Sequence, residues 1–228
     1  AGLLAGVAIA AKAQRPDIKI IAVEAAAAAS FTASLAAGKP VNAPVRPTLA
    51  DGLAVGRVGD RSFALAAPRV DRVLTVDEQA LSLAVLRLLE LEKTSCEGAG
   101  AAALAALMGE AGQELKGRKV VLLLCGGNID PTVLHRVIDH GLAVDGRLWR
   151  FTATVSDRPG GMAKLTQVIA DAGASVLEIN HDRAFSGPEV FSTTVEVTVE
   201  TADHDHIQAL RERLHEADFG VISATGCR

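Results

Sequence analysis

Cys125 is a residue whose type and position in the sequence could support chemistry. It ends the apolar run Val120 to Leu124 and is followed directly by Gly126 and Gly127. Five consecutive apolar residues predict a central strand that is buried on both faces. In an open α/β sheet, ligands lie outside the carboxyl ends of the strands. Cys125 is therefore either a small hydrophobic residue of the core or a thiol that faces a ligand.

Glu97 is the second such residue, because it is the one charge in the run of small residues from Thr94 to Ala101. Small residues allow a helix to begin in close contact with another group. The carboxylate either interacts favourably with the positive end of the helix dipole or faces a ligand. The motif itself favours neither interpretation.

The elements that must position these residues repeat in a strand, turn and helix order that is typical of a mostly parallel sheet. A capping box, Thr75 with Glu78, predicts the start of one of the helices. Glu24 lies at the carboxyl end of the first strand. The patterns predict helices over residues 3–11, 25–37, 77–92, 101–108 and 132–140, and strands over residues 18–24, 70–76 and 120–124.

Composition limits the class of protein. The 228 residues are 49% hydrophobic and 22% charged, which is typical of a globular protein with a core, and the net charge of −4 argues against nucleic-acid binding. No apolar run reaches the roughly 18 residues that a membrane helix needs. Three widely spaced cysteines predict a reducing compartment, and we expect a cytoplasmic protein. Because the chain begins without Met and inside a helix pattern, we expect it to be the C-terminal part of a longer protein.

Four motifs in order resemble those of threonine dehydratases (threonine ammonia-lyases), and serine dehydratases and serine racemase share most of them. They are Gly2-Leu3-Leu4-Ala5-Gly6, Leu49-Ala50-Asp51-Gly52, Glu97-Gly98-Ala99-Gly100-Ala101 and Cys125-Gly126-Gly127-Asn128-Ile129-Asp130. The resemblance covers residues 1 to about 140. It implies part of an α/β pyridoxal-phosphate domain of fold type II, the tryptophan-synthase β-subunit fold.

The resemblance also implies roles for cofactor-binding residues. Gly2 is what remains of a glycine loop that wraps the cofactor phosphate, and Gly52 and Glu97 lie beside the pyridine ring. Cys125, followed by Gly126, matches the Ser or Cys that hydrogen-bonds the pyridine nitrogen. A thiol is a neutral and weak partner, so it would leave that nitrogen largely unprotonated.

Two further implications concern groups that are incomplete or missing. Glu24 matches a carboxylate of a divalent-cation site in some relatives, but Ser30 stands where a second carboxylate usually follows. The family's Schiff-base lysine lies upstream of the glycine loop, and no lysine of this chain occupies that motif position. We therefore expect this chain alone to be inactive.

The pattern changes after the linker expected over Gly141 to Arg147. Strands over 148–155, 174–182, 190–200 and 220–224, with helices over 162–172 and 203–216, predict the order βαββαβ, the α+β ferredoxin-like arrangement. This half resembles an ACT domain. The predicted domains are residues 1–143 and 148–228.

The ACT resemblance implies an amino-acid effector, plausibly isoleucine or valine, and a homo-oligomer that pairs through ACT domains. The residues that match its signature turn are Asp157, Gly160, Gly161 and Met162. The same turn could serve dimer contacts alone. His204 and His206, with neighbouring aspartates, are either a metal-binding tract or a solvated helix start, and the second interpretation is favoured.

Three functions follow from these resemblances. The leading hypothesis is pyridoxal-phosphate-dependent β-elimination of L-threonine to 2-oxobutanoate and ammonia by the intact protein, regulated through the ACT domain. The first alternative is a serine dehydratase or a serine racemase with the same cofactor site. The second is a non-catalytic regulatory protein that binds an amino acid.

Overall fold

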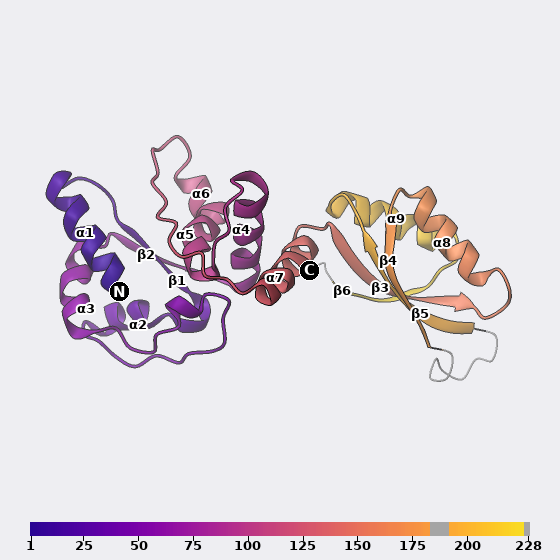
Figure 1. The fold of residues 1–228 in the computed structure, drawn as a ribbon, viewed down its shortest axis with the longest axis horizontal. Coiled ribbons are helices and arrows are strands. Elements are labelled where there is room, and N and C mark those ends of the chain that lie inside the picture. The colour runs from indigo at the N-terminus through magenta and orange to yellow at the C-terminus, as the bar shows by residue number, and fades with distance from the viewer. Residues whose placement is uncertain (183–191, 226–228) are drawn as a thin grey trace. The chain divides into compact units, whose positions relative to one another are not determined.

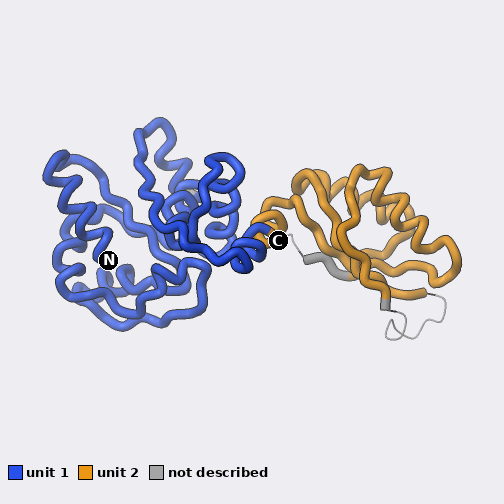
Figure 2. The backbone as a smooth tube through the Cα atoms, in the orientation of Figure 1, with its two compact units in different colours: residues 1–138 blue, residues 139–228 orange. Residues whose placement is uncertain are grey.

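The fold is that of a computed structural model, which describes residues 1–182 and 192–225. The chain divides into two compact units, residues 1–138 and 139–228, shown in blue and orange in Figure 2. Cys227 and the first two residues of the strand predicted from Val190 lie outside the described residues. In the described part of the chain, no helix is both long enough and apolar enough to cross a membrane.

Unit 1 is built from short helices around a small parallel sheet (Figure 1). Its strands and α-helices are α1 (Gly2–Gln14), β1 (Ile21–Ala25), α2 (Ser30–Ala37), α3 (Asp60–Ala66), β2 (Arg72–Val76), α4 (Glu78–Leu91), α5 (Gly98–Met108) and α6 (Glu110–Glu114), and α7 (Pro131–Val144) begins in it and continues into unit 2. Its 3-10 turns are η1 (Ala26–Ala28), η2 (Asp51–Leu53) and η3 (Ala67–Arg69).

β1 and β2 pair in parallel, with Ile21 opposite Arg72 and Ala25 opposite Val76, as the sequence predicted. The main core of unit 1 is rich in alanine because α4 and α5 pack closely against this sheet. Its fully buried members include Ala25, Leu81 and Ala101. The unit therefore depends on close approach of backbones more than on large side chains.

Asp71, just before β2, binds the residues that precede β1. Its carboxylate accepts hydrogen bonds from Lys19 Nζ at 2.9 Å, from the Ile20 amide at 2.9 Å and from Lys12 Nζ at 3.1 Å. The hydrogen bond from Lys19 is the largest of the causes that hold the pKa of Asp71 well below its usual range. Because Lys12 belongs to α1, this cluster also ties α1 to the sheet.

The prediction of a buried strand over residues 120–124 is wrong. Among the described residues no strand pairs with this run, and Val121 is 89% exposed. An apolar run becomes a buried strand only where neighbouring strands pair with its amides and carbonyls and other elements cover both faces. Here β1 and β2 pair with each other.

The predicted capping box is also wrong, because Thr75 lies inside β2. α4 is capped by Asp77, whose Oδ1 accepts a hydrogen bond from the Ala80 amide at 2.8 Å. The Glu78 carboxylate instead binds the loop that contains Leu49.

α7 continues to Val144 through residues that were expected to form a linker. Its first turn is capped by Asp130, whose carboxylate accepts a hydrogen bond from the Thr132 amide at 2.7 Å.

Unit 2 has the predicted βαββαβ order and is confirmed as ferredoxin-like. Its elements are β3 (Leu148–Ser156), α8 (Gly161–Asp171), β4 (Ser175–Asp182), β5 (Ser192–Glu200), α9 (His204–Glu216) and β6 (Val221–Thr225). The antiparallel sheet has the order β4-β5-β3-β6, with α8 and α9 on one side of it (Figure 1). The alternation in β5 is confirmed, since Val195, Val197 and Val199 are fully buried.

The core of unit 2 lies between this sheet and its two helices. Trp149 stacks on Phe151 with ring centroids 4.4 Å apart, and Leu165 of α8 and Leu210 of α9 complete the layer. Apolar positions at helical spacing on α8 and α9 thus meet inward positions at strand spacing on β3 and β5. This core fixes the end of β3 and the start of α8, where the sequence predicted an effector site.

Candidate cofactor site and effector pocket

Glycines at the start of α5 bring three separate segments of unit 1 together. A Cβ built on Gly98 would lie 2.5 Å from the Leu49 carbonyl oxygen. A Cβ built on Gly100 would lie 2.6 Å from Cys96 Sγ and would overlap with the Cys125 carbonyl oxygen. No side chain fits at either position. The start of α5 therefore packs directly on the backbones of the Leu49 loop and of the segment that ends in Cys125.

Glu97 lies at the centre of this cluster. It is the N-cap residue of α5, but its side chain makes no cap hydrogen bond. Its backbone amide donates to the Gly126 carbonyl oxygen at 3.2 Å. Gly126 has a φ of +93°, and a Cβ there would lie 2.5 Å from Glu97 Cδ. Glycine at position 126 thus allows both a positive φ and the close approach of the Glu97 carboxylate.

Gly52 also lies close to the Glu97 carboxylate. A Cβ built on Gly52 would lie 3.1 Å from Ala99 Cβ and 3.8 Å from Glu97 Oε1. The turn η2 that contains it begins two residues after Leu49, which packs against Gly98. The structure therefore brings Gly52, Glu97 and Gly126 together from motifs that are far apart in the sequence.

The two described cysteines of unit 1 differ in environment. Cys96 is buried, and burial raises the pKa of its thiol, with a smaller contribution from the nearby Glu97 carboxylate. Cys125 is exposed, so it is not a core residue in this structure. The Cys125 thiol is therefore open to a ligand, and the residue that follows it, Gly126, packs on the Glu97 carboxylate. An exposed thiol close in sequence to side-chain-free backbone is compatible with one end of a flat aromatic cofactor.

Two other residues named by the sequence lie outside this cluster. Gly2 is the first residue of α1, and a Cβ built there would contact nothing within 4 Å. Glu24 is at the end of β1, and its carboxylate binds the start of α2: it accepts from the Phe31 amide at 2.7 Å and from the Thr32 amide and hydroxyl at 2.8 Å. Among the described residues, no three His, Cys, Asp or Glu side chains are grouped as a metal site would require.

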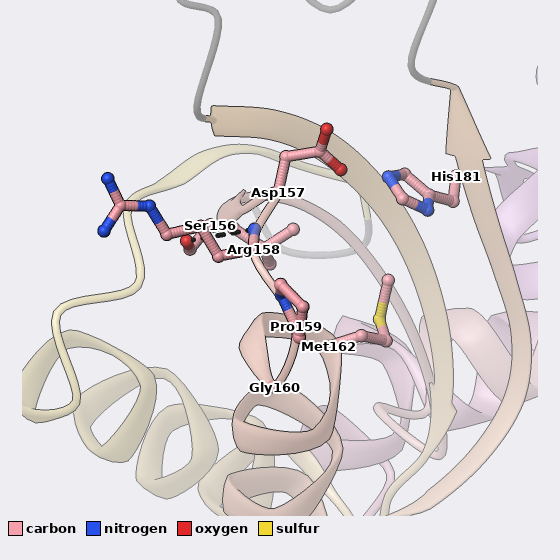
Figure 3. A pocket seen from close by; sticks show the side chains of 8 residues that line it. Ser156, Asp157, Arg158, Pro159, Gly160, Met162 and His181 are labelled. Carbon is pink, nitrogen blue, oxygen red and sulfur yellow. Dashed lines mark hydrogen bonds between the residues drawn. The ribbon is translucent and has the colours of Figure 1, made fainter.

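In unit 2, a pocket of about 300 Å³ lies where β3 ends and α8 begins (Figure 3). Asp157, Gly160 and Met162 line it, as expected from the sequence. Gly160 has a φ of +97° and is the N-cap residue of α8. Gly161 does not line the pocket; a Cβ there would lie 3.0 Å from the Ser156 carbonyl carbon, so its role is close packing of α8 on β3.

His181 is a pocket residue that the sequence reasoning missed. In Figure 3 its ring and the Asp157 carboxylate face one another across the opening, and the Met162 side chain extends toward them. A signal for it was present, because His181 pairs opposite the buried Val195 and follows Ile179 at strand spacing. It must therefore lie on the face of β4 that α8 covers. The pocket combines a carboxylate, an imidazole and apolar side chains, which suits a small amphoteric ligand.

The His and Asp residues near position 204 form a helix start, as favoured from the sequence. Asp203 caps α9 by accepting from the His206 amide at 2.8 Å. The ring of His206 accepts from the Ala202 amide at 3.0 Å through Nδ1, and its Nε2 lies 2.8 Å from the Ala172 carbonyl oxygen. Both ring nitrogens are therefore used in holding the start of α9 to the end of α8.

Family models match both units. The model described as "Pyridoxal-phosphate dependent enzyme" matches residues 1–126. The chain belongs to this family of pyridoxal-phosphate dependent enzymes. A second model, "ACT domain", matches residues 151–219, so this member of the family carries an ACT domain in unit 2.

Relatives of this pyridoxal-phosphate family member are similar over both units. L-threonine ammonia-lyases of Thermotoga maritima and Geobacter sulfurreducens are 37% and 41% identical to it over 220 residues, 96% of this chain and 54% of each relative. The structure of the processed form of threonine deaminase isoform 2 from Solanum lycopersicum is 34% identical, with a TM-score of 0.57, over 60% of this chain and 40% of that chain. The chain thus spans about half the length of the curated relatives it matches.

The fold class expected from the sequence is confirmed by these matches. Part of a fold-type II pyridoxal-phosphate domain is followed by an ACT domain. The family implies pyridoxal phosphate as cofactor. The divalent cation expected at Glu24 gains no support, because helix amides already bind both oxygens of that carboxylate.

Proposed function

We propose that the protein containing this chain catalyses β-elimination of L-threonine to 2-oxobutanoate and ammonia with pyridoxal phosphate. The observation that carries the proposal is that the similarity to L-threonine ammonia-lyases extends through both the cofactor motifs and the ACT domain. Two motif glycines also have a physical reason to be glycine, since Gly52 and Gly126 both lie close to Glu97.

In this proposal the residues around Glu97 form one wall of the cofactor site. Bound pyridoxal phosphate supplies an electron sink for the charge that develops when the α-proton of the substrate is removed. Gly52 and Gly126 leave room for the ring, and Cys125 is the hydrogen-bond partner of the pyridine nitrogen. As a neutral thiol, Cys125 would leave that nitrogen largely unprotonated, a state that would suit elimination of a β-hydroxyl. Gly2, at the start of α1, contributes a backbone amide to the phosphate.

The remaining parts of the proposal concern regulation and assembly. The pocket of Asp157, Gly160 and Met162 binds an amino-acid effector such as isoleucine or valine, and Gly161 supports it by letting α8 pack closely on β3. Differential binding of the effector to two states of the enzyme transmits the signal. We further propose a cytoplasmic homo-oligomer that pairs through ACT domains, with domain limits at residues 1–143 and 148–228.

A product assay tests the catalytic proposal. The protein that contains these residues, loaded with pyridoxal phosphate, is given L-threonine or L-serine, and 2-oxobutanoate or pyruvate is measured. We expect 2-oxobutanoate to form faster, and no product without the cofactor. Faster formation of pyruvate would support a serine dehydratase, and racemisation without elimination a serine racemase.

Effector binding is tested separately by calorimetric titration of this chain with isoleucine and with valine. Saturable binding of either ligand supports the regulatory role. Binding without any elimination activity in the longer protein would favour the non-catalytic regulatory protein instead.

A further inference from the structure

We infer that Glu78 is a positioning residue for the cofactor site, because it holds the loop of residues 48–52 against the start of α5. The loop is called the Gly52 loop below. This inference deepens the proposed function and rests on it for the link to the cofactor. The loop contacts themselves do not depend on the function.

The carboxylate of Glu78 binds the Gly52 loop through both of its oxygens. Its Oε1 accepts from the Thr48 hydroxyl at 2.5 Å, and its Oε2 accepts from the Leu49 amide at 2.7 Å. The Thr48 hydroxyl in turn accepts from the Ala50 amide at 3.2 Å. One carboxylate therefore fixes three consecutive residues at the entrance of the loop, all of them partly or fully shielded from solvent.

The opposite side of the loop packs on α5. The Leu49 carbonyl and side chain fill the space where Gly98 lacks a Cβ, and Ala50 is fully buried. Two residues further on, Gly52 lies against Ala99 and near the Glu97 carboxylate. The loop is thus held between the first residue of α4 and the first turn of α5. A shift at Thr48 or Leu49 must move Gly52 relative to Glu97.

A carboxylate suits this position for two reasons. Two donors converge on it, and an ionised Glu offers two acceptor oxygens where an amide offers one. The N-terminus of α4 also favours a negative charge, since its first amides lack helical partners. Glu78 acts through the loop, so its removal should weaken cofactor binding through a displaced Gly52.

Asp77 provides a matched control because it is the adjacent carboxylate at the same helix end. It caps α4 by accepting from the Ala80 amide, and its side chain makes no hydrogen bond to the Gly52 loop among the described residues. Glu78→Ala and Asp77→Ala remove the same charge from the same place. A simple loss of α4 stability would affect both variants alike, whereas release of the loop would affect the first alone.

Amide hydrogen exchange of the 228-residue chain is the first measurement. We expect Glu78→Ala to speed exchange of the Leu49 amide about tenfold or more, the effect of losing a hydrogen bond to a charged group. Asp77→Ala should leave Leu49 unchanged and speed exchange at Ala80. Glu78→Gln, which keeps one acceptor, should fall between Glu78→Ala and wild type and serves if the alanine variant does not fold. Equal exchange at Leu49 in all variants, or equal acceleration by both alanine variants, would overturn the inference.

The second measurement is the dissociation constant of pyridoxal phosphate, followed by cofactor absorbance, in the longer protein that contains these residues. Glu78→Ala should raise it about tenfold, and Asp77→Ala should leave it within about twofold of wild type. Faster exchange at Leu49 without weaker cofactor binding would overturn the positioning role. Failure of the wild-type protein to bind the cofactor would refute the proposed function, while the exchange data would still decide whether Glu78 holds the loop.

Discussion

Replacing Gly100 with alanine tests the packing that gathers the cofactor motifs. Gly100 lies in α5, where a Cβ would lie 2.6 Å from Cys96 Sγ and 2.9 Å from the Cys125 carbonyl carbon. The obstacle at Cys125 is backbone, so no rotamer change can relieve it. Gly6 is the natural control: it is also inside a helix, α1, and a Cβ there would contact nothing within 4 Å.

The two substitutions should change stability in opposite directions. Overpacking costs about 1–3 kcal/mol, and alanine returns about 1 kcal/mol of helix preference over glycine. Because the clash is with backbone, Gly100→Ala should lie at the upper end of that cost and lose about 2 kcal/mol overall. Gly6→Ala should instead gain about 0.5–1 kcal/mol, since only the flexibility of the unfolded chain changes.

Urea unfolding monitored by circular dichroism measures both changes. Trp149 is the one tryptophan of the chain and lies in unit 2, so its fluorescence is an internal control that neither substitution should alter. A Gly100→Ala variant as stable as wild type would refute the reasoning, because residues 120–126 would then not pack on α5 as described.

Three further predictions follow from polar contacts in the two units. Neighbouring lysines and a backbone amide depress the pKa of Asp71 in the folded state. The ionised Asp71 therefore stabilises the fold above the unfolded-state pKa of about 4, and this stabilisation is lost as the pH falls toward the folded-state pKa. Between pH 7 and pH 3 the urea midpoint of unit 1 should fall less steeply in Asp71→Asn than in wild type. His206→Ala loses two ring hydrogen bonds and should lower the free energy of unfolding of unit 2 by about 1–2 kcal/mol, measured by Trp149 fluorescence. His215 is exposed, so His215→Ala should leave that free energy unchanged. His181→Ala should weaken effector binding about tenfold in calorimetry, and unchanged binding would remove the imidazole from the pocket's function.

Local sequence patterns predicted those elements whose structure depends on local contacts. The apolar spacing of α9 and the strict alternation of β5 each identify the buried face correctly. The failures occur where long-range partners decide. Residues 120–124 have the composition of a strand but no strand pairs with them among the described residues, and α4 begins at Glu78 because β2 extends to Val76.

The sequence predicted which residues belong to the candidate site, but not which residues hold them in place. Glu97, Gly52 and Gly126 could be named from motifs, and the structure supplies the reason: each glycine permits an approach to one carboxylate. Glu78 could not be named as a site residue, because its partners lie in the loop that begins at Thr48, which sequence spacing does not connect to it. His181 shares a strand face with Ile179, but only the fold shows that this face meets the β3–α8 turn.

The nitrogen-15 chemical shift of pyridoxal phosphate labelled at its ring nitrogen tests the central claim most directly. That claim is that Cys125, an exposed residue followed by the glycine that packs on Glu97, is the neutral partner of the pyridine nitrogen. The account predicts the shift of an unprotonated pyridine in the wild-type longer protein and that of a pyridinium in Cys125→Asp, since a carboxylate stabilises the added proton. Identical shifts in the two proteins would contradict the account, because the residue at position 125 would then not contact the ring nitrogen.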